Sequence, residues 1–172
     1  MAEQRIADAI MRVMDMAFDP VFGEAWTRSQ LLGALVLPDT RCVLIDDAGN
    51  LAPPYLDRPD VDRPDVDRPD LDRICGFALL RRVLDEEELL LIAISPESRG
   101  RGLGARLLDR AVETSRDLGC SKIFLEMRDD NPARHLYHAR GFRPVGLRRD
   151  YYSGRDGKRR NAITFMRMIN AP

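Results

Sequence analysis

Three glycines alternate with two arginines in a turn that separates an apolar run from a helical pattern. The stretch SPESRGRGLGARLLDRA, residues 95–111, follows the apolar run ELLLIAI and has glycine at positions 100, 102 and 104. Glycine allows a ligand to approach the backbone closely, because it carries no side chain. The free N–H groups of a first helical turn and the helix dipole both favour an anion at such a place. The turn therefore predicts a phosphate-binding site.

Three phosphate-binding signatures compete for this turn. The Walker loop needs Gly-Lys-Ser/Thr after the glycines, and Ala105, Arg106 and Leu107 stand there instead, which excludes it. The dinucleotide fingerprint G-x-G-x-x-A is matched by GRGLGA, with Glu126 as its ribose-binding acid, but the chain after Glu126 is too short for further βαβ units. The third signature, R/Q-x-x-G-x-G/A, is matched at every defined position by residues 99–104 and is the preferred interpretation.

The elements around the turn must position it. Helical periodicity or capping signals predict four helices: about 4–18, one that starts at Thr27 with a capping box to Gln30, about 103–118 ending at Gly119, and a short one in NPARHLYHAR with Pro132 in its first turn. Apolar runs and alternation predict strands at 41–47, 74–83, 88–94, 122–127, 142–152 and 161–169. The run 88–94 is apolar throughout and is predicted to be central, and LDEE before it indicates a hairpin.

A five-residue unit repeats between the first two predicted strands, in DRPDVDRPDVDRPDLDR, Asp57 to Arg73. A period of five fits neither strand nor helix, and the proline in each unit removes a backbone donor. The segment 57–73 is therefore interpreted as an exposed loop insertion. It holds seven Asp against four Arg, so an acidic arm that binds a partner is the alternative.

Composition excludes several classes of protein. With 172 residues, the chain suits one domain, and its formal net charge of −1 gives no reason to expect a nucleic-acid partner. No apolar run approaches the roughly 20 residues that span a bilayer, and the N-terminal stretch lacks the apolar core of a signal peptide. Cys42, Cys75 and Cys120 are widely spaced and odd in number, which indicates buried small hydrophobic residues. We therefore expect a cytoplasmic protein with no membrane partner.

With this turn and this order of elements, the chain resembles the GCN5-related N-acetyltransferases, whose pyrophosphate loop for acetyl-coenzyme A has the form R/Q-x-x-G-x-G/A. The resemblance covers nearly the whole chain except the repeat. Within that superfamily, four stretches look like the ribosomal-protein-alanine N-acetyltransferases: FGEAWTRSQL, IAISPESRGRGLG, LEMRDDNPARHLYHARGF and RRDYY. The resemblance implies an α/β fold, with one N-acetyltransferase domain over residues 1–172 and a mixed central sheet of about six to seven strands with flanking helices.

The resemblance also implies acetyl-CoA as co-substrate and no metal. The pyrophosphate would lie on the backbone amides from Gly100 to Ala105, with Arg99 and Arg101 adding positive charge. The strand at 92–94 would splay from its neighbour and pair through its backbone with the pantetheine. An amide of that strand can also polarise the thioester oxygen. The expected cofactor-binding residues are Ile92, Ala93, Ile94, Arg99, Gly100, Arg101, Gly102, Leu103, Gly104, Ala105 and Asn131.

Two side chains carry the expected chemistry. Glu126, at the end of an apolar strand, would accept a proton from the acceptor ammonium, directly or through water; a surface glutamate paired with Arg128 is the alternative. Tyr137 matches the family's tyrosine that protonates the departing thiolate, and the alternative is an aromatic packed under Phe142. Asn131 matches a cofactor-contacting asparagine, and otherwise caps the helix that follows.

Other residues near these positions have less specific interpretations. His135 and His138 are three apart on a predicted helix, but no carboxylate or cysteine stands at matching spacing, so they are interpreted as surface histidines. Trp26, Tyr151 and Tyr152 either line the acceptor groove or pack as partly buried aromatics.

Two features depart from the family pattern. The stretch from Asn131 to Tyr137 is one residue shorter than in many relatives, and Asn161 stands where relatives often carry an aspartate. The implied function is acetylation of a protein N-terminal α-amine, such as that of a ribosomal protein with N-terminal alanine. Acetylation of a small-molecule amine and a non-catalytic acyl-CoA-binding module remain as alternatives.

Overall fold

The computed structural model describes residues 2–52 and 70–169, so most of the 57–73 repeat lies outside the described residues. The helices are α1 (Ala2–Ala17), α2 (Arg28–Leu35), α3 (Leu103–Asp117) and α4 (Arg134–Ala139), with 3₁₀ turns η2 (Leu71–Arg73) and η3 (Pro96–Ser98). The strands are β1 (Thr40–Asp46), β2 (Leu51–Ala52), β3 (Ile74–Val83), β4 (Glu86–Ile94), β5 (Lys122–Arg128), β6 (Arg143–Ser153) and β7 (Arg159–Met168).

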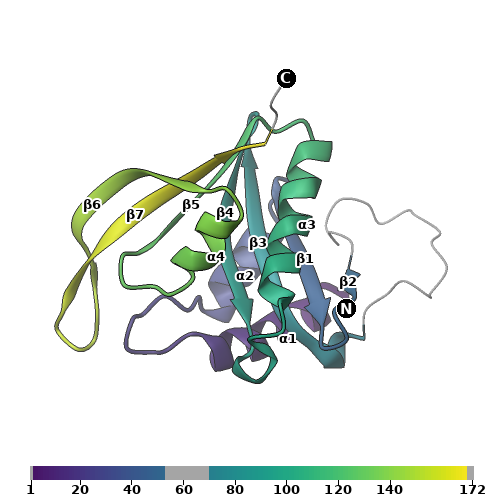
Figure 1. The fold of residues 1–172 in the computed structure, drawn as a ribbon. Helices are drawn as coiled ribbons and strands as arrows, with labels where there is room; N and C mark the ends of the chain where they lie inside the picture. The colour runs from purple at the N-terminus through teal and green to yellow at the C-terminus, as the bar shows by residue number, and fades with distance from the viewer. Residues whose placement is uncertain (1, 53–69, 170–172) are drawn as a thin grey trace.

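One mixed sheet of seven strands forms the centre of this part of the molecule (Figure 1), in the order β2-β1-β3-β4-β5-β7-β6. The pair β4 and β5 is parallel, and the other neighbours are antiparallel. The predicted α/β class, the central place of β4 and the β3–β4 hairpin are confirmed. The two-residue strand β2 is too short to give an alternating pattern, and sequence analysis missed it.

The two faces of the sheet carry separate apolar clusters. Helices α1 and α2 cover one face, where Ile10, Met14 and Leu31 are fully buried. Helix α3 covers the other face with Leu107 and Leu108 (Figure 1). The predicted capping box that starts α2 is confirmed, since Thr27 Oγ1 accepts from the Gln30 N–H and Gln30 Oε1 from the Thr27 N–H.

A bulge in β4 reverses the direction of its side chains. Leu79 pairs with Leu91 and Leu80 pairs with Leu89, so Leu90 has no partner in β3. A single extra residue moves every later side chain to the opposite face. Accordingly, Leu89 belongs to the cluster under α3, and Leu91 belongs to the cluster under α1.

The parallel strands β4 and β5 separate immediately before the bulge. They pair at three positions only, from Glu86 with Lys122 to Glu88 with Phe124. Beyond these, β4 continues to Ile94 along β3, and β5 continues to Arg128 along β7. The splay expected for the strand at 92–94 is therefore confirmed, and it opens a gap in the middle of the sheet.

The short helix after β5 begins later than predicted. Pro132 lies in a turn before α4, and the helix starts at Arg134. The reason is local: Asn131 Oδ1 accepts the Ala133 N–H at 2.9 Å, which forms a turn ahead of the helix.

Candidate functional site

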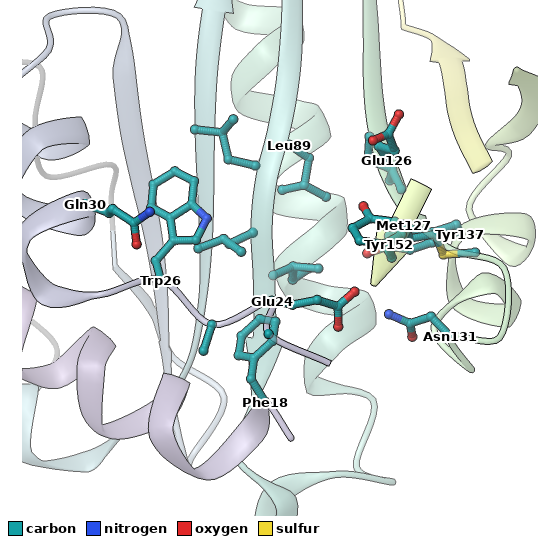
Figure 2. A pocket seen from close by; sticks show the side chains of 16 residues that line it. Phe18, Glu24, Trp26, Gln30, Leu89, Glu126, Met127, Asn131, Tyr137 and Tyr152 are labelled. Atoms are coloured by element: carbon teal, nitrogen blue, oxygen red, sulfur yellow. The ribbon is translucent and has the colours of Figure 1, made fainter. Parts of the chain in front are cut away.

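A cleft of about 360 Å³ lies where β4 and β5 separate (Figure 2). One wall comes from β4 and from the loop between α1 and α2, and the other from β5, α4 and β6. The structure brings the predicted residues Glu126, Tyr137, Asn131 and Ile92 to this one cleft. Its lining residues are Phe18, Gly23, Glu24, Ala25, Trp26, Gln30, Leu89, Leu90, Leu91, Ile92, Leu125, Glu126, Met127, Asn131, Tyr137 and Tyr152.

The glycine turn adjoins the end of β4 rather than lining the cleft. Gly102 is the N-cap of α3 in a left-handed conformation (φ 75°), and a Cβ placed there would meet nothing within 4 Å. The first helical hydrogen bond runs from the Arg106 N–H to the Gly102 carbonyl at 3.1 Å. The amides of residues 103–105 therefore precede the helical ladder and have no helical acceptor, which fits an anion held by the backbone. Leu103 is buried, so only its backbone can contact such a ligand.

The two arginines of the turn bind carbonyl groups of the protein. Arg99 donates to the carbonyl of Ile94 at 3.1 Å and to that of Ala17 at 3.0 Å. Arg101 donates to the Asp47 carbonyl at 2.8 Å. Both side chains thus fasten the turn to the ends of α1, β1 and β4, and both residues are exposed at the surface.

Glu126 is half-buried and forms an ion pair with Arg148 on β6. The alternative of a pair with Arg128 is wrong, because Arg128 is buried and turns to a different partner. Its Nε donates to Glu24 Oε1 at 2.8 Å, and its guanidinium lies 3.4 Å from the ring centroid of Phe22. The end of β5 is thereby fastened to the loop between α1 and α2.

Tyr137 is buried, and its ring lies edge-on to Phe142 with the centroids 5.8 Å apart. It therefore packs as the alternative interpretation expected, and it also lines the cleft. Burial and, to a smaller degree, the charge of Glu24 raise the pKa of the Tyr137 phenol above its usual value. The phenol is thus protonated throughout the physiological pH range.

Asn131 has both a capping contact and a place in the cleft. Its Oδ1 accepts from the Ala133 N–H, as the capping alternative expected. Figure 2 shows its amide nitrogen turned towards Glu24, so the donor side of the amide faces the cleft.

The three aromatic residues have different positions. Trp26 and Tyr152 line the cleft, whereas Tyr151 is exposed and lies edge-on to Tyr152 at 5.2 Å. Burial, with Glu126 and Glu24 nearby, raises the pKa of Tyr152 to about 12. Trp26 and Tyr152 are therefore cleft-lining residues, and Tyr151 lies outside the cleft.

Asn161 holds a bulge in β6. Arg148 pairs with Ala162 and Tyr152 with Arg160, so three residues of β6 face Asn161 alone. Its Oδ1 accepts from the Asp150 N–H at 3.0 Å, and its Nδ2 donates to Asp129 at 2.8 Å. Asn161 thus fixes the segment that leads to Tyr152.

Sequence analysis missed Glu24. This residue follows Gly23 in the loop between α1 and α2, and its carboxylate lies in the cleft. The signal available in the sequence was an acid two residues before Trp26 in FGEAW. Its partner Arg128 lies 104 residues further along the chain, and periodicity carries no information at that distance.

The histidines and cysteines do not gather. Within residues 2–52 and 70–169, no group of three His, Cys, Asp or Glu side chains could hold a metal ion. His138 is exposed and lies edge-on to Phe165 at 5.1 Å. Cys42, Cys75 and Cys120 are free and buried, as predicted. In the same part of the chain, no helix is long and apolar enough to cross a membrane.

A mixed sheet that opens between two parallel strands beside a glycine turn is the architecture expected of the N-acetyltransferases. Residues 45–142 match the model of the Acetyltransferase (GNAT) family, and the chain belongs to this family. The [ribosomal protein bS18]-alanine N-acetyltransferase of Haemophilus influenzae is 41% identical over 91 residues, which are 53% of this chain and 62% of that protein. The match thus spans less than two thirds of the relative's own length.

Solved structures support the same fold. The crystal structure of the ribosomal-protein-S18-alanine N-acetyltransferase from Escherichia coli has a TM-score of 0.73 and 23% identity, covering 96% of this chain and 89% of that one. A Bacillus subtilis acetyltransferase in complex with CoA has a TM-score of 0.51 and 21% identity, covering 56% of this chain and 70% of that one.

Proposed function

We propose that the protein is an acetyl-CoA-dependent N-acetyltransferase that acts in the cytoplasm on the N-terminal α-amine of a protein. The observation that carries the proposal is the convergence of Glu126 and Tyr137 on one cleft where β4 and β5 separate. A non-catalytic acyl-CoA-binding module needs neither group. The name of the Haemophilus influenzae relative supports an alanine N-terminus, as on ribosomal protein bS18, as the acceptor.

The residues at the end of β4 and in the glycine turn would hold the co-substrate. The amides from Gly100 to Ala105 would bind the pyrophosphate, and the open edge of β4 at Ile92, Ala93 and Ile94 would pair with the pantetheine. The fit is supported by the free space over Gly102 and by the missing β5 partner beyond Glu88. Acetyl-CoA supplies an acetyl group activated as a thioester.

Glu126 and Tyr137 would move the protons. Glu126 takes a proton from the acceptor ammonium, directly or through water, which frees the nitrogen lone pair. The new bond joins this nitrogen to the acetyl carbonyl carbon, and the carbon–sulfur bond breaks. Tyr137 Oη gives its proton to the departing sulfur. The nitrogen loses its second proton as the amide forms, and this proton returns to the Tyr137 phenolate, directly or through water. Arg148 pairs with Oε2 of Glu126 in this structure, so the proton goes to Oε1 or to Oε2 after Arg148 has moved aside.

The test is acetyl transfer by purified protein to three acceptors: a peptide with N-terminal alanine, a lysine peptide with a blocked N-terminus, and a polyamine. We expect the alanine peptide to have the highest kcat/KM, and Glu126→Gln to lower it by about 10²–10⁴-fold near neutral pH. Glu113→Gln, on the exposed surface of α3, is the matched control and should leave the rate unchanged. Preferred transfer to the polyamine would overturn the acceptor class, and absence of transfer to all three would overturn the activity.

A further inference from the structure

Two charged residues line the cleft in the described part of the chain, and both are acids. Glu126 is on β5, and Glu24 is on the loop between α1 and α2, on the other side of the opening. Figure 2 shows the Glu24 carboxylate turned across the cleft towards Asn131 and the two tyrosines. A cleft lined by acids favours a cationic group of the ligand.

The two carboxylates differ in how far they are neutralised. Glu126 is paired with Arg148, one negative charge with one positive charge. Glu24 lies at the end of a network of ion pairs. Arg128 pairs with both Glu24 and Asp130, and Arg160 pairs with both Asp130 and Asp156. Three carboxylates share two guanidinium groups in this network of ion pairs, and Glu24 is the one of the three that lines the cleft.

Glu24 also has hydrogen-bonding capacity left. Its Oε1 accepts from Arg128, and no hydrogen bond to its Oε2 is found among residues 2–52 and 70–169. The side chain retains 19% of its exposure, and Glu24 lines the cleft. An ammonium group, with three N–H donors, is a fitting partner for such an oxygen.

The loop that carries Glu24 is held at several points. Phe22 stacks on the Arg128 guanidinium, the Val21 carbonyl accepts from the Arg155 N–H at 2.8 Å, and the Trp26 N–H is 3.1 Å from the sulfur of Met14. The carboxylate is therefore positioned before a ligand arrives, which lowers the cost of ordering it on binding.

We propose that Glu24 binds the α-ammonium group of the acceptor and holds it in the cleft beside Glu126. The inference rests on the proposed function and names the group that recognises its substrate. It gives the two acids different tasks: Glu24 attracts and orients the protonated amine, and Glu126 removes its proton. The influence of Glu24 on the pKa values of both Tyr137 and Tyr152 supports its place beside the reacting groups.

The test compares Glu24→Gln with wild type on two acceptor peptides that differ in one group. One has an N-terminal alanine, whose amine is an ammonium at pH 7, and the other has an aminooxy group there, which is neutral. We expect Glu24→Gln to lower kcat/KM for the ammonium peptide by about 10- to 100-fold, the range of a charge-assisted hydrogen bond. The aminooxy peptide should change less than threefold, and the KM for acetyl-CoA should not change.

Three further measurements keep the outcome unambiguous. Glu24→Asp keeps the charge and should retain part of the preference for the ammonium peptide, and Glu113→Gln should behave as wild type. Calorimetry of the ammonium peptide should show a loss of affinity in Glu24→Gln of the same order as the kinetic loss. Equal losses on both peptides, or an unchanged affinity in calorimetry, would overturn the inference. If wild type acetylates neither peptide, the proposed function fails, and calorimetry still decides whether Glu24 binds the ammonium group.

Discussion

Two glycines of the same turn should respond to alanine with opposite signs. Gly102 has φ 75°, where an L-residue costs roughly 1–2 kcal/mol, although its Cβ would meet no atom within 4 Å. Gly104 has an ordinary helical conformation, and its Cβ would lie 3.6 Å from Ile94 and 3.7 Å from Leu136, both normal contacts. Alanine at a helical position gains about 0.8–1 kcal/mol over glycine. Gly102→Ala should therefore lower stability, and Gly104→Ala should raise it.

These free energies convert into measurable shifts of the melting temperature. For a chain of this length, 1 kcal/mol corresponds to about 2–4 °C. We expect Gly102→Ala to melt roughly 2–8 °C below wild type and Gly104→Ala roughly 2–4 °C above it, by differential scanning calorimetry. Both proteins should remain folded, because natural domains have about 5–15 kcal/mol of stability.

A charged side chain at residue 102 tests acetyl-CoA binding separately from stability. A carboxylate at residue 102 would stand beside the place proposed for the pyrophosphate. Two unit negative charges about 6 Å apart repel by about 3 kcal/mol at an effective dielectric constant near 20, or roughly 100-fold in affinity. Gly102→Gln has the same backbone strain without the charge and is the control. Isothermal titration with acetyl-CoA should show a loss of affinity in both variants, because both side chains fill the space over residue 102, and a loss about 100-fold larger in Gly102→Glu, where the charge adds to it. A folded Gly102→Glu protein with wild-type affinity would refute the assignment of the turn as the pyrophosphate site.

Three other predictions concern the cleft and its surroundings. Tyr137→Phe should lower turnover by about 10²–10⁴-fold with little change in acetyl-CoA affinity. Tyr151→Phe, which lies outside the cleft, should leave turnover unchanged. Near-normal turnover in Tyr137→Phe would mean that another group gives the proton. The pKa values of Tyr137 and Tyr152 are raised above the value near 10 of the unfolded chain, so the free energy of unfolding should fall as pH rises above 10, by up to about 1.4 kcal/mol per pH unit for each group. Urea denaturation should show a shallower fall in Tyr137→Phe than in wild type. An equally steep fall in Tyr137→Phe would contradict the assignment. Asn161→Ala should cost about 1–3 kcal/mol of stability and raise the acceptor KM through the β6 bulge, with an unchanged KM arguing that the bulge does not position Tyr152.

Local patterns were sufficient to predict most elements of the sheet and its helices. The apolar run of β4 predicted a central strand, and Thr27 with Gln30 predicted the start of α2, because both signals depend on residues close in sequence. The bulge at Leu90 was not predictable. A bulge shows in a sequence as a shift in the alternation of apolar and polar residues, and the apolar run of β4 has no such alternation.

For the candidate site, the sequence predicted the separation of β4 from its neighbour and the place of Glu126 and Tyr137, but not the ion pairs around them. Glu126 and Tyr137 do meet in one cleft. The partner of Glu126 lies on β6, and the partner of Arg128 lies before α2, so both pairs depend on how distant segments pack. The sequence offers several charged residues near each of these positions, and only tertiary structure selects among them.

The short junction between β4 and β5 has a mechanical consequence. On one side of the opening the two parts of the sheet are joined by three backbone pairs, and beside the cleft the Phe22 and Glu24 loop is clamped to Arg128. Because the gap is held on both sides, its width is already fixed in the folded protein before any ligand binds. Loosening the clamp, for example by Phe22→Ala, should therefore widen the range of openings that the unliganded protein samples, and hydrogen exchange along the free edge of β4 would report it.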